Sequence, residues 1–222
     1  MKSFPIGLIL WAATLMFVAA TFPVSAQPNE TPVTPTNEIA LFDGNSLSGW
    51  TFVSQGTNAP AASIWSVTNG VIVCQGRPNG YARTLQKYRD YQLHAEWRYP
   101  DGAGNSGFFL HLNPPDKVWP FCFEAQLLSG SAGEVRMNGG SKADGLTAQF
   151  PISIPRQQAS SEKPLGEWNA CDIVCRANTI TVRVNGMLQN TVTGTSAVSG
   201  TIGLQAEGKL VEFRHLVLAP LP

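Results

Sequence analysis

The clearest pattern in the chain is a strict alternation of apolar and polar residues between Arg89 and Tyr99. Aromatic or aliphatic side chains stand at every second position, and Gln, His, Glu and Arg stand between them. Because successive side chains of a strand point to opposite faces, a period of two over this length predicts a half-buried antiparallel strand. One face of this strand should therefore join a core, and the other should meet polar surroundings.

Shorter segments of the same kind follow one another along the chain. They predict strands at 70–74, 107–112, 121–128, 168–176, 179–184 and 210–218. Turn signals separate them, and Asn185-Gly186 between two apolar runs is a strong signal for a two-residue hairpin. The sequence after residue 26 shows no amphipathic helical stretch of ten or more residues. About a dozen short strands must then bury their apolar faces against one another, which predicts an all-β sandwich or jelly roll of two antiparallel sheets.

Two segments between the strands are predicted to be long loops. Residues 136–150 are rich in glycine, and residues 151–166 contain three prolines. Long loops at one end of a sandwich often form a functional site, because a rigid scaffold positions them there.

The first 26 residues differ in composition from the rest. Lys2 precedes an apolar run over residues 4–20, and Val24-Ser25-Ala26 has the small-residue pattern of a cleavage site. This predicts a secretory signal peptide over 1–26 and a secreted or periplasmic protein with no membrane attachment after cleavage. The alternative is an uncleaved anchor, although the run is shorter than the roughly 20 residues of a spanning helix. The polar, proline-rich residues 27–37 predict a disordered linker before a single domain over 38–222.

Charge and composition narrow the class of protein. Without its first 26 residues the chain has 14 Lys and Arg against 15 Asp and Glu, a net charge of −1, which argues against a nucleic-acid partner. With 14% charged and 43% hydrophobic residues, the chain is suited to one domain with a substantial core. The oligomeric state does not follow from the sequence.

The four cysteines leave two alternatives open. Cys171 and Cys175 fall on one predicted strand, about 13 Å apart at the usual rise per residue, which is too far for a bond between them. Either each pairs with Cys74 or Cys122, or all four are reduced and packed as apolar residues. No close Cys-x-x-Cys or Cys/His spacing favours a zinc site.

Candidate site residues follow from sorting the strand faces. In the predicted strand 121–128, Glu124 and Gln126 share the face opposite the aromatic residues, where they could bind sugar hydroxyls or transfer protons. In the strand 107–112, alternation places Phe108, Leu110 and Leu112 toward the core and leaves Phe109 and His111 on the second face. An aromatic ring beside an imidazole can stack on a sugar while the imidazole exchanges protons.

Each of these residues also has a purely structural interpretation. Glu124 and Gln126 could belong to a solvated outer face, and His111 could be a hydrogen-bonded surface histidine. His94, Glu96 and Arg98 could form a cross-strand polar ladder on an exposed sheet. Trp119 lies in a predicted loop and is a better candidate for ligand contact than the tryptophans of the strands.

Several segments in order resemble one family, the 3-keto-disaccharide hydrolase domain of the concanavalin A-like lectin and glucanase superfamily. The matching pieces are LFDGNSLSGW from Leu41, WSVTNGVI from Trp65, YQLHAEWR from Tyr91, GNSGFFL from Gly104, EAQ from Glu124, GEWN from Gly166, VNG from Val184, and IGLQ from Ile202 with VEFR from Val211. The resemblance covers roughly residues 39–220 and implies a concanavalin A-like jelly roll.

The resemblance also implies cleavage of glycosides whose sugar carries a ketone at C3. Such a ketone acidifies the C2 hydrogen, so a base can remove it and expel the C1 substituent, after which water adds. We expect Glu124 to be the base or acid and His111 its partner, with Glu96 as an alternative base. Arg98 or Gln126 would polarise and position the sugar, and Asn105 would orient a hydroxyl.

The resemblance implies no cofactor. A divalent metal could replace the cationic stabiliser, although no ligand set can be recognised from spacing. Two other functions stay open at this point. One is a non-catalytic glycan-binding module that uses Phe109 and Trp119 as platforms, and the other is a lyase that stops after elimination.

Overall fold

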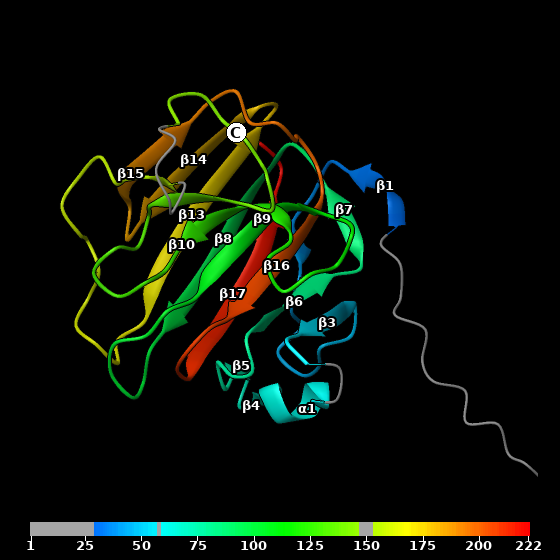
Figure 1. Cartoon of the computed structure of the whole chain (residues 1–222), viewed down its shortest axis with the longest axis vertical. Helices are drawn as coiled ribbons and strands as arrows, with labels where there is room; N and C mark the ends of the chain where they lie inside the picture. Colours follow the sequence, from blue (N-terminus) through cyan, green and yellow to red (C-terminus); the bar gives the residue numbers. More distant parts are fainter. Residues whose placement is uncertain (1–28, 57–58, 147–152) are drawn as a thin grey trace, which may run out of the picture.

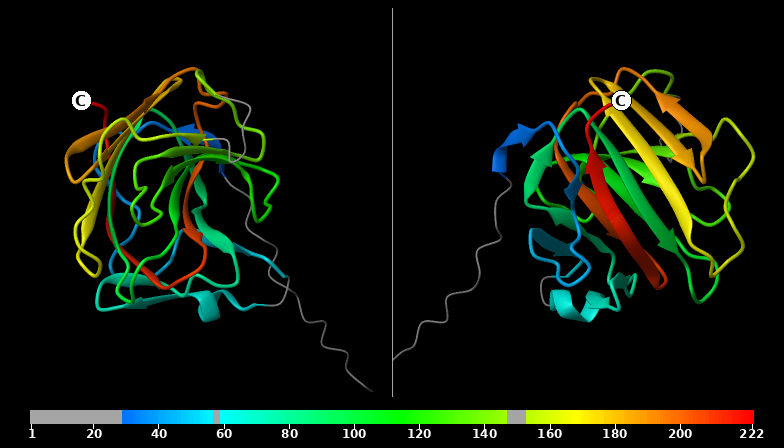
Figure 2. Two further views of the ribbon diagram at one scale, coloured as in Figure 1. Left: turned by 60° about the vertical axis from the view of Figure 1, so that its left-hand side comes forward. Right: turned by 180° about the vertical axis from the view of Figure 1, so that it is seen from behind.

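The structure is a computed structural model that describes residues 29–56, 59–146 and 153–222. The predicted signal peptide lies outside these residues. Two antiparallel sheets stack face to face, as the two views of Figure 2 show. The first sheet has seven strands in the order β12 (Ser153–Ile154), β11 (Val135–Asn138), β10 (Phe121–Gln126), β9 (Gly107–Asn113), β16 (Thr201–Ala206), β6 (Gly80–Thr84) and β3 (Trp50–Ser54).

The second sheet has eight strands (Figure 1). Their order is β15 (Met187–Val192), β14 (Thr179–Val184), β13 (Asn169–Arg176), β8 (Tyr91–Arg98), β17 (Val211–Ala219), β5 (Val71–Cys74) and β4 (Trp65–Thr68), with β2 (Ile39–Ala40) also paired to β17. The helix α1 (Ala61–Ile64) is a single turn. No helix in the described residues is long and apolar enough to cross a membrane. The predicted all-β sandwich is thus confirmed, with strands at each of the segments that the alternation indicated.

The core lies between the two sheets and is built by the predicted alternation. The inward residues of β8 are Tyr91, Leu93, Ala95 and Trp97, and none of them is exposed to solvent. They pack in one apolar cluster with the inward residues of β10, Phe123 and Ala125, from the facing sheet. Burial of this shared apolar surface is the main favourable term that holds the layers together.

The cysteines and the N-terminal segment resolve two further expectations. All four cysteines are buried and unbonded, so the reduced alternative holds and no disulfide joins the sheets. The linker predicted to be disordered is partly a strand, because β1 (Asn29–Val33) pairs in parallel with β7 (Gln86–Tyr88). The Arg89 amide and the Gln86 side chain donate to the backbone carbonyls of Val33 and Thr31. Proline-rich composition does not prevent this pairing, because an edge strand need not donate at every position.

The strand β9 departs from regular alternation at His111. Its register shifts by one residue between Leu110 and Asn113 relative to β10, and a matching shift occurs against β16. His111 has a left-handed backbone with φ 49°, which is the geometry of an inserted bulge residue. The bulge turns His111 into the core and places Leu112 on the opposite face, so the predicted faces of both residues are wrong.

The surroundings of His111 are apolar. Its ring contacts Tyr91 and Phe123 with centroid distances of 5.9 and 6.3 Å, and Nδ1 lies 3.0 Å from the Ala197 carbonyl oxygen. Since a carbonyl only accepts, Nδ1 carries a proton. Burial lowers the pKa of His111 to about 4, against the smaller opposing effects of Ala197 and Asp90, so the imidazole is neutral at pH 7. His111 is therefore a core residue that anchors the loop before β16.

This burial predicts an acid-sensitive contribution to stability. The folded pKa lies below that of the unfolded chain, so the unfolded chain takes up a proton first and stability falls from pH 6.5 toward pH 4, by about 3 kcal/mol. The variant His111→Asn tolerates the left-handed backbone but cannot titrate. Urea unfolding across this pH range should show a steeper loss for the wild type than for the variant. Equal slopes would contradict the neutral, buried imidazole.

Candidate functional site

A set of polar side chains covers the face of the seven-stranded sheet that points away from the core. Alternation in β10 turns Glu124 and Gln126 to this side, because Phe123 and Ala125 point inward. The register of the neighbouring strands adds further polar residues to the same face. We call this group the polar face; its members are Asn105, Glu124, Gln126, Arg136, Asn138, Gln205 and Glu207.

Glu124 is the most buried carboxyl group of the polar face, with 2% of its surface exposed. The Asn138 amide donates to Glu124 Oε2 over 2.7 Å. Gly107 on β9 leaves room for the side chain, because a Cβ at this position would lie 2.6 Å from Glu124 Cγ. Burial raises the pKa of Glu124 to about 7, and nearby Glu207 adds to the effect, while Asn138 and Arg136 oppose it. At neutral pH this carboxyl group can therefore both release and accept a proton.

A second carboxyl group stands at the end of β16. Glu207 forms a β-bridge with Asn105, and the Asn105 side chain acts to lower the pKa of the Glu207 carboxyl group. Burial raises the pKa of Glu207, and the charges of Arg136 and Arg77 partly offset this. The Arg136 guanidinium acts on Glu207 and on Glu124 alike. The positive charge of Arg136 thus favours the ionised form of both acids, the buried Glu124 and the half-buried Glu207.

The polar face concentrates unpaired hydrogen-bonding atoms. Within the described residues, five of the ten buried side-chain atoms without a partner belong to it: Asn105 Oδ1, Glu124 Oε1, Gln126 Nε2, Arg136 Nε and Gln205 Oε1. Gln126 shows how this arises, since its Oε1 accepts from the Leu127 and Leu128 amides and its Nε2 is left free. Unpaired buried polar atoms are costly, so their clustering makes this face the candidate functional site. Three acceptors and two donors suit hydroxyl groups, which do both.

The loop between β9 and β10 reaches across the same side of the sheet. Asp116 in this loop accepts two bonds from Arg83, from Nε over 3.0 Å and from Nη2 over 2.8 Å, and one from Tyr81 over 3.1 Å. Arg83 lies on β6, three strands from β10, so it stands about 14 Å across the sheet from Glu124. The ion pair fixes the loop that carries Trp119, which is 45% exposed.

Two aromatic residues of the expected site differ in accessibility. Phe109 lies on the outward side of β9 as predicted, but it is fully buried and its ring packs against Tyr81 at 5.6 Å. It therefore cannot act as an open stacking platform in this structure. Trp119 remains accessible at the tip of its loop.

Glu96 and Arg98 lie on the far side of the molecule from Glu124. They point outward from β8 in the eight-stranded sheet, where Glu96 accepts from Arg214 over 2.6 Å and lies 3.1 Å from His215. Arg98 donates to Glu212 over 2.6 Å. Both belong to a cross-strand polar ladder, so the structural interpretation is confirmed for them. The predicted meeting of Glu96, Arg98 and His111 with Glu124 is wrong.

Four residues of the polar face had no place in the expected site. Arg136 and Asn138 fall on β11, although the glycine-rich segment that holds them was predicted to be a loop. Gln205 and Glu207 follow the apolar run of β16, whose pairing with β9 and β6 is not readable from one sequence. The alternation of polar and apolar residues in the short run Val135–Asn138 would have placed Arg136 and Asn138 together on one face of a strand. The described residues contain no group of three or more His, Cys, Asp or Glu that could hold a metal ion.

The architecture is that of a concanavalin A-like jelly roll, as predicted. A solved structure from Parabacteroides distasonis, described as a candidate glycosyl hydrolase, is 20% identical and aligns with a TM-score of 0.62 over 84% of this chain and 94% of its own. The β-glucanase of Bacillus licheniformis is 16% identical and aligns with a TM-score of 0.54 over 84% and 99%. At these identities the likeness establishes the fold alone.

The sequence defines the family within this fold. Residues 37–219 match the family described as the 3-keto-alpha-glucoside-1,2-lyase-like domain, and the chain belongs to this family. A protein named 3-keto-disaccharide hydrolase from Bacteroides thetaiotaomicron is 26% identical over 167 residues, which are 67% of this chain and 56% of that protein. The chain thus spans little more than half the length of this relative. The resemblance noted in the sequence is confirmed.

The burial of Glu124 predicts that this residue lowers the free energy of unfolding as the pH rises. Its folded pKa lies above that of the unfolded chain, so its contribution to stability is complete below about pH 4.5 and is lost as pH rises through 7, by about 3 kcal/mol. Arg136, Glu207 and Cys122 face the same carboxyl group and are unchanged in Glu124→Gln. The difference in unfolding free energy between wild type and this variant should therefore shift in favour of the variant between pH 4.5 and 8. A constant difference would contradict the raised pKa.

The Asp116 contact predicts an unequal effect of two similar substitutions. Asp116→Asn leaves the Arg83 charge buried without its partner and should cost about 3 kcal/mol. Asp172→Asn is the control. The Asp172 side chain is 30% exposed, close to the 27% of Asp116, but the partner of Asp172, His94, is 40% exposed, whereas Arg83 is 1% exposed. Exposed pairs contribute about 1 kcal/mol or less. Thermal unfolding of both variants measures the contrast, and equal losses would contradict the role of the buried ion pair.

Proposed function

We propose that this protein is a carbohydrate-active hydrolase that cleaves glycosides carrying a ketone at C3. The observation that carries the proposal is the pairing of two acids of raised pKa, the buried Glu124 and the half-buried Glu207, near one arginine, Arg136. Family membership and the name of the Bacteroides relative support this class of substrate. The predicted signal peptide would place the reaction outside the cytoplasm.

The chemistry requires a base, an acid and a stabiliser of negative charge. Glu124 as carboxylate removes the proton from C2, and the electron pair forms an enolate whose negative charge rests on the C3 oxygen. Arg136 stabilises this oxygen, because a half-buried cation already in place opposes developing negative charge with little reorganisation. When the enolate collapses, the C1–O bond breaks, and protonated Glu207 gives its proton to the departing oxygen.

Hydration completes the cleavage with the same groups. Water adds to C1 and gives a proton to Glu207, now a carboxylate, while protonated Glu124 returns a proton to C2. The net change is hydrolysis, and both acids regain their starting states. Gln126, Asn105 and Gln205 hold the sugar hydroxyls through the atoms that are otherwise unpaired. Arg136 takes the role that the sequence suggested for Arg98, and Glu207 takes that of His111.

The proposal predicts that Glu124 and Glu96 differ sharply in their importance. Incubation of the protein with a 3-keto-disaccharide should release the second sugar, and Glu124→Gln should lower kcat/KM by about 10²- to 10⁴-fold. Glu96→Gln, which removes the same charge from the opposite surface, should change kcat/KM less than twofold. Equal effects of the two variants would contradict the assignment.

The products separate the remaining alternatives. A glycal that accumulates without hydration would establish a lyase, in keeping with the 1,2-lyase description of the family. Binding of the sugar without any release by the wild type would instead establish a glycan-binding module and overturn the proposal.

A further inference from the structure

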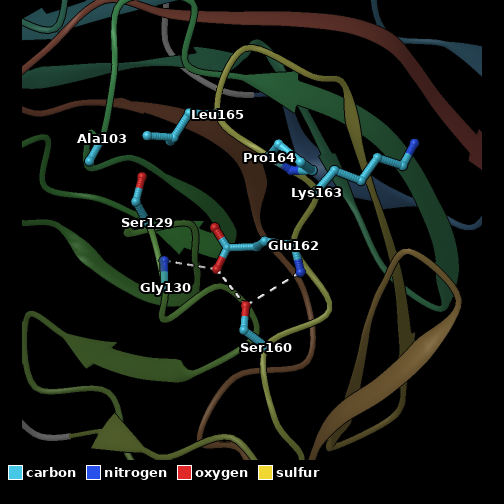
Figure 3. Close-up of a pocket in the computed structure, with 8 residues that line it drawn as sticks. All are labelled: Ala103, Ser129, Gly130, Ser160, Glu162, Lys163, Pro164 and Leu165. Atoms are coloured by element: carbon cyan, nitrogen blue, oxygen red, sulfur yellow. Dashed lines mark hydrogen bonds between the residues drawn. The ribbon is translucent and has the colours of Figure 1, made fainter.

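A concave site lies among three loops next to one end of the polar face, since Ala103 and Ser129 stand two and three residues from Asn105 and Gln126. It has a volume of about 490 Å³, within the range of roughly 300–1,000 Å³ that is usual for small-molecule sites. Its walls come from the segment before β9, the turn after β10 and the segment before β13 (Figure 3). The residues that line it include Ala103, Ser129, Ser160, Glu162, Pro164 and Leu165.

The carboxylate of Glu162 lines this pocket and is held in place by hydrogen bonds to one of its oxygens. Its Oε2 accepts from the Gly130 amide over 2.9 Å, from the Ala132 amide over 3.4 Å and from the Ser160 hydroxyl over 2.9 Å. All the hydrogen bonds that Glu162 accepts from the described residues go to this oxygen. Figure 3 shows the other oxygen, Oε1, directed to the side of Ser129 and Leu165. A fixed acceptor with a free oxygen is pre-organised for a donor on a ligand.

The nearby cations are engaged elsewhere. Lys163 Nζ donates to the Trp168 carbonyl over 2.9 Å, and Figure 3 shows its side chain leading away from the pocket. Arg156 donates to the Gly130 carbonyl. Neither forms an ion pair with Glu162, so the carboxylate keeps its capacity to accept.

The remaining walls combine one hydroxyl with an apolar surface. Ser129 Oγ accepts from the Gly104 amide over 3.0 Å, which leaves its own hydrogen free to be donated. Ala103, Pro164 and Leu165 supply carbon surface, and Leu165 is 58% exposed although it is a large apolar residue. An acceptor, a hydroxyl and an apolar wall together fit a sugar ring, which has hydroxyl groups at its rim and C–H groups on its faces.

We propose that this pocket is an accessory site for a neutral, hydroxyl-rich ligand of the size of one hexose unit. The Glu162 carboxylate accepts from two adjacent hydroxyls, Ser129 donates to a third oxygen, and Leu165 packs on the C–H face. No residue of the polar face lines this pocket, and binding there does not depend on the reaction proposed for Glu124.

The test uses sugars that the proposed reaction cannot cleave. Glucose and cellobiose lack a C3 ketone, and their binding to the protein is followed by amide chemical shifts in a titration. The account predicts saturable shifts at Ser129, Gly130 and the 160–165 segment, with a dissociation constant in the millimolar range, which corresponds to a binding free energy of about −4 kcal/mol. No saturable shift at these residues, whatever occurs at Glu124 and Gln126, would overturn it.

Two variants and one control make the result specific. Glu162→Gln keeps an oxygen for the Gly130 and Ser160 bonds but replaces the free acceptor by a donor, and should weaken binding about tenfold or more. Leu165→Ser changes an exposed side chain, cannot disturb the core, and should also weaken binding. Glu96→Gln, which changes a residue on the outer surface of the other sheet, should bind as the wild type does. Shifts produced by calcium chloride and not by the sugars would assign the pocket to a cation instead.

Discussion

The position of one buried carboxyl group, Glu124, governs the proposed chemistry of this protein. A carboxylate withdrawn from water is unfavourable unless it is paired, and here only one of its oxygens has a partner, Asn138. The strand register brings Asn138 and Arg136 beside it, and the absence of a side chain at Gly107 gives it space. The scaffold thus maintains a costly arrangement that stability alone would not favour, and such arrangements are typical of functional sites.

The two sheets illustrate how surroundings decide the role of a glutamate. Glu96 and Glu124 both lie on central strands and both point away from the core. Burial opposes ionisation of Glu96, but bonds from Arg214 and His215 outweigh it and lower the pKa. At Glu124 burial dominates and raises the pKa. The first glutamate is therefore a fixed anion in a surface ladder, and the second can exchange a proton near neutral pH.

Sequence reasoning succeeded where the signal was local and periodic. Alternation in β8 and β10 placed the inner and outer faces correctly, including those of Glu124 and Gln126. It failed at His111, because one inserted residue reverses every face that follows, and no composition marks it. It also could not pair β11 or β16 with their neighbours, so Arg136 and Glu207 were missed. Long-range register depends on burial summed over both sheets, which a single sequence does not display.

The central claim is that Glu124 is a buried acid poised for proton transfer, and its own titration tests this most directly. The side-chain carboxyl carbon can be followed by NMR in protein labelled with ¹³C at glutamate, with the Glu124→Gln spectrum identifying its signal. The account predicts a titration midpoint near pH 7, since burial raises the pKa of Glu124 to about 7. A midpoint near the ordinary glutamate value of about 4.3 would contradict it, because the carboxyl group would then be solvated and permanently ionised at neutral pH.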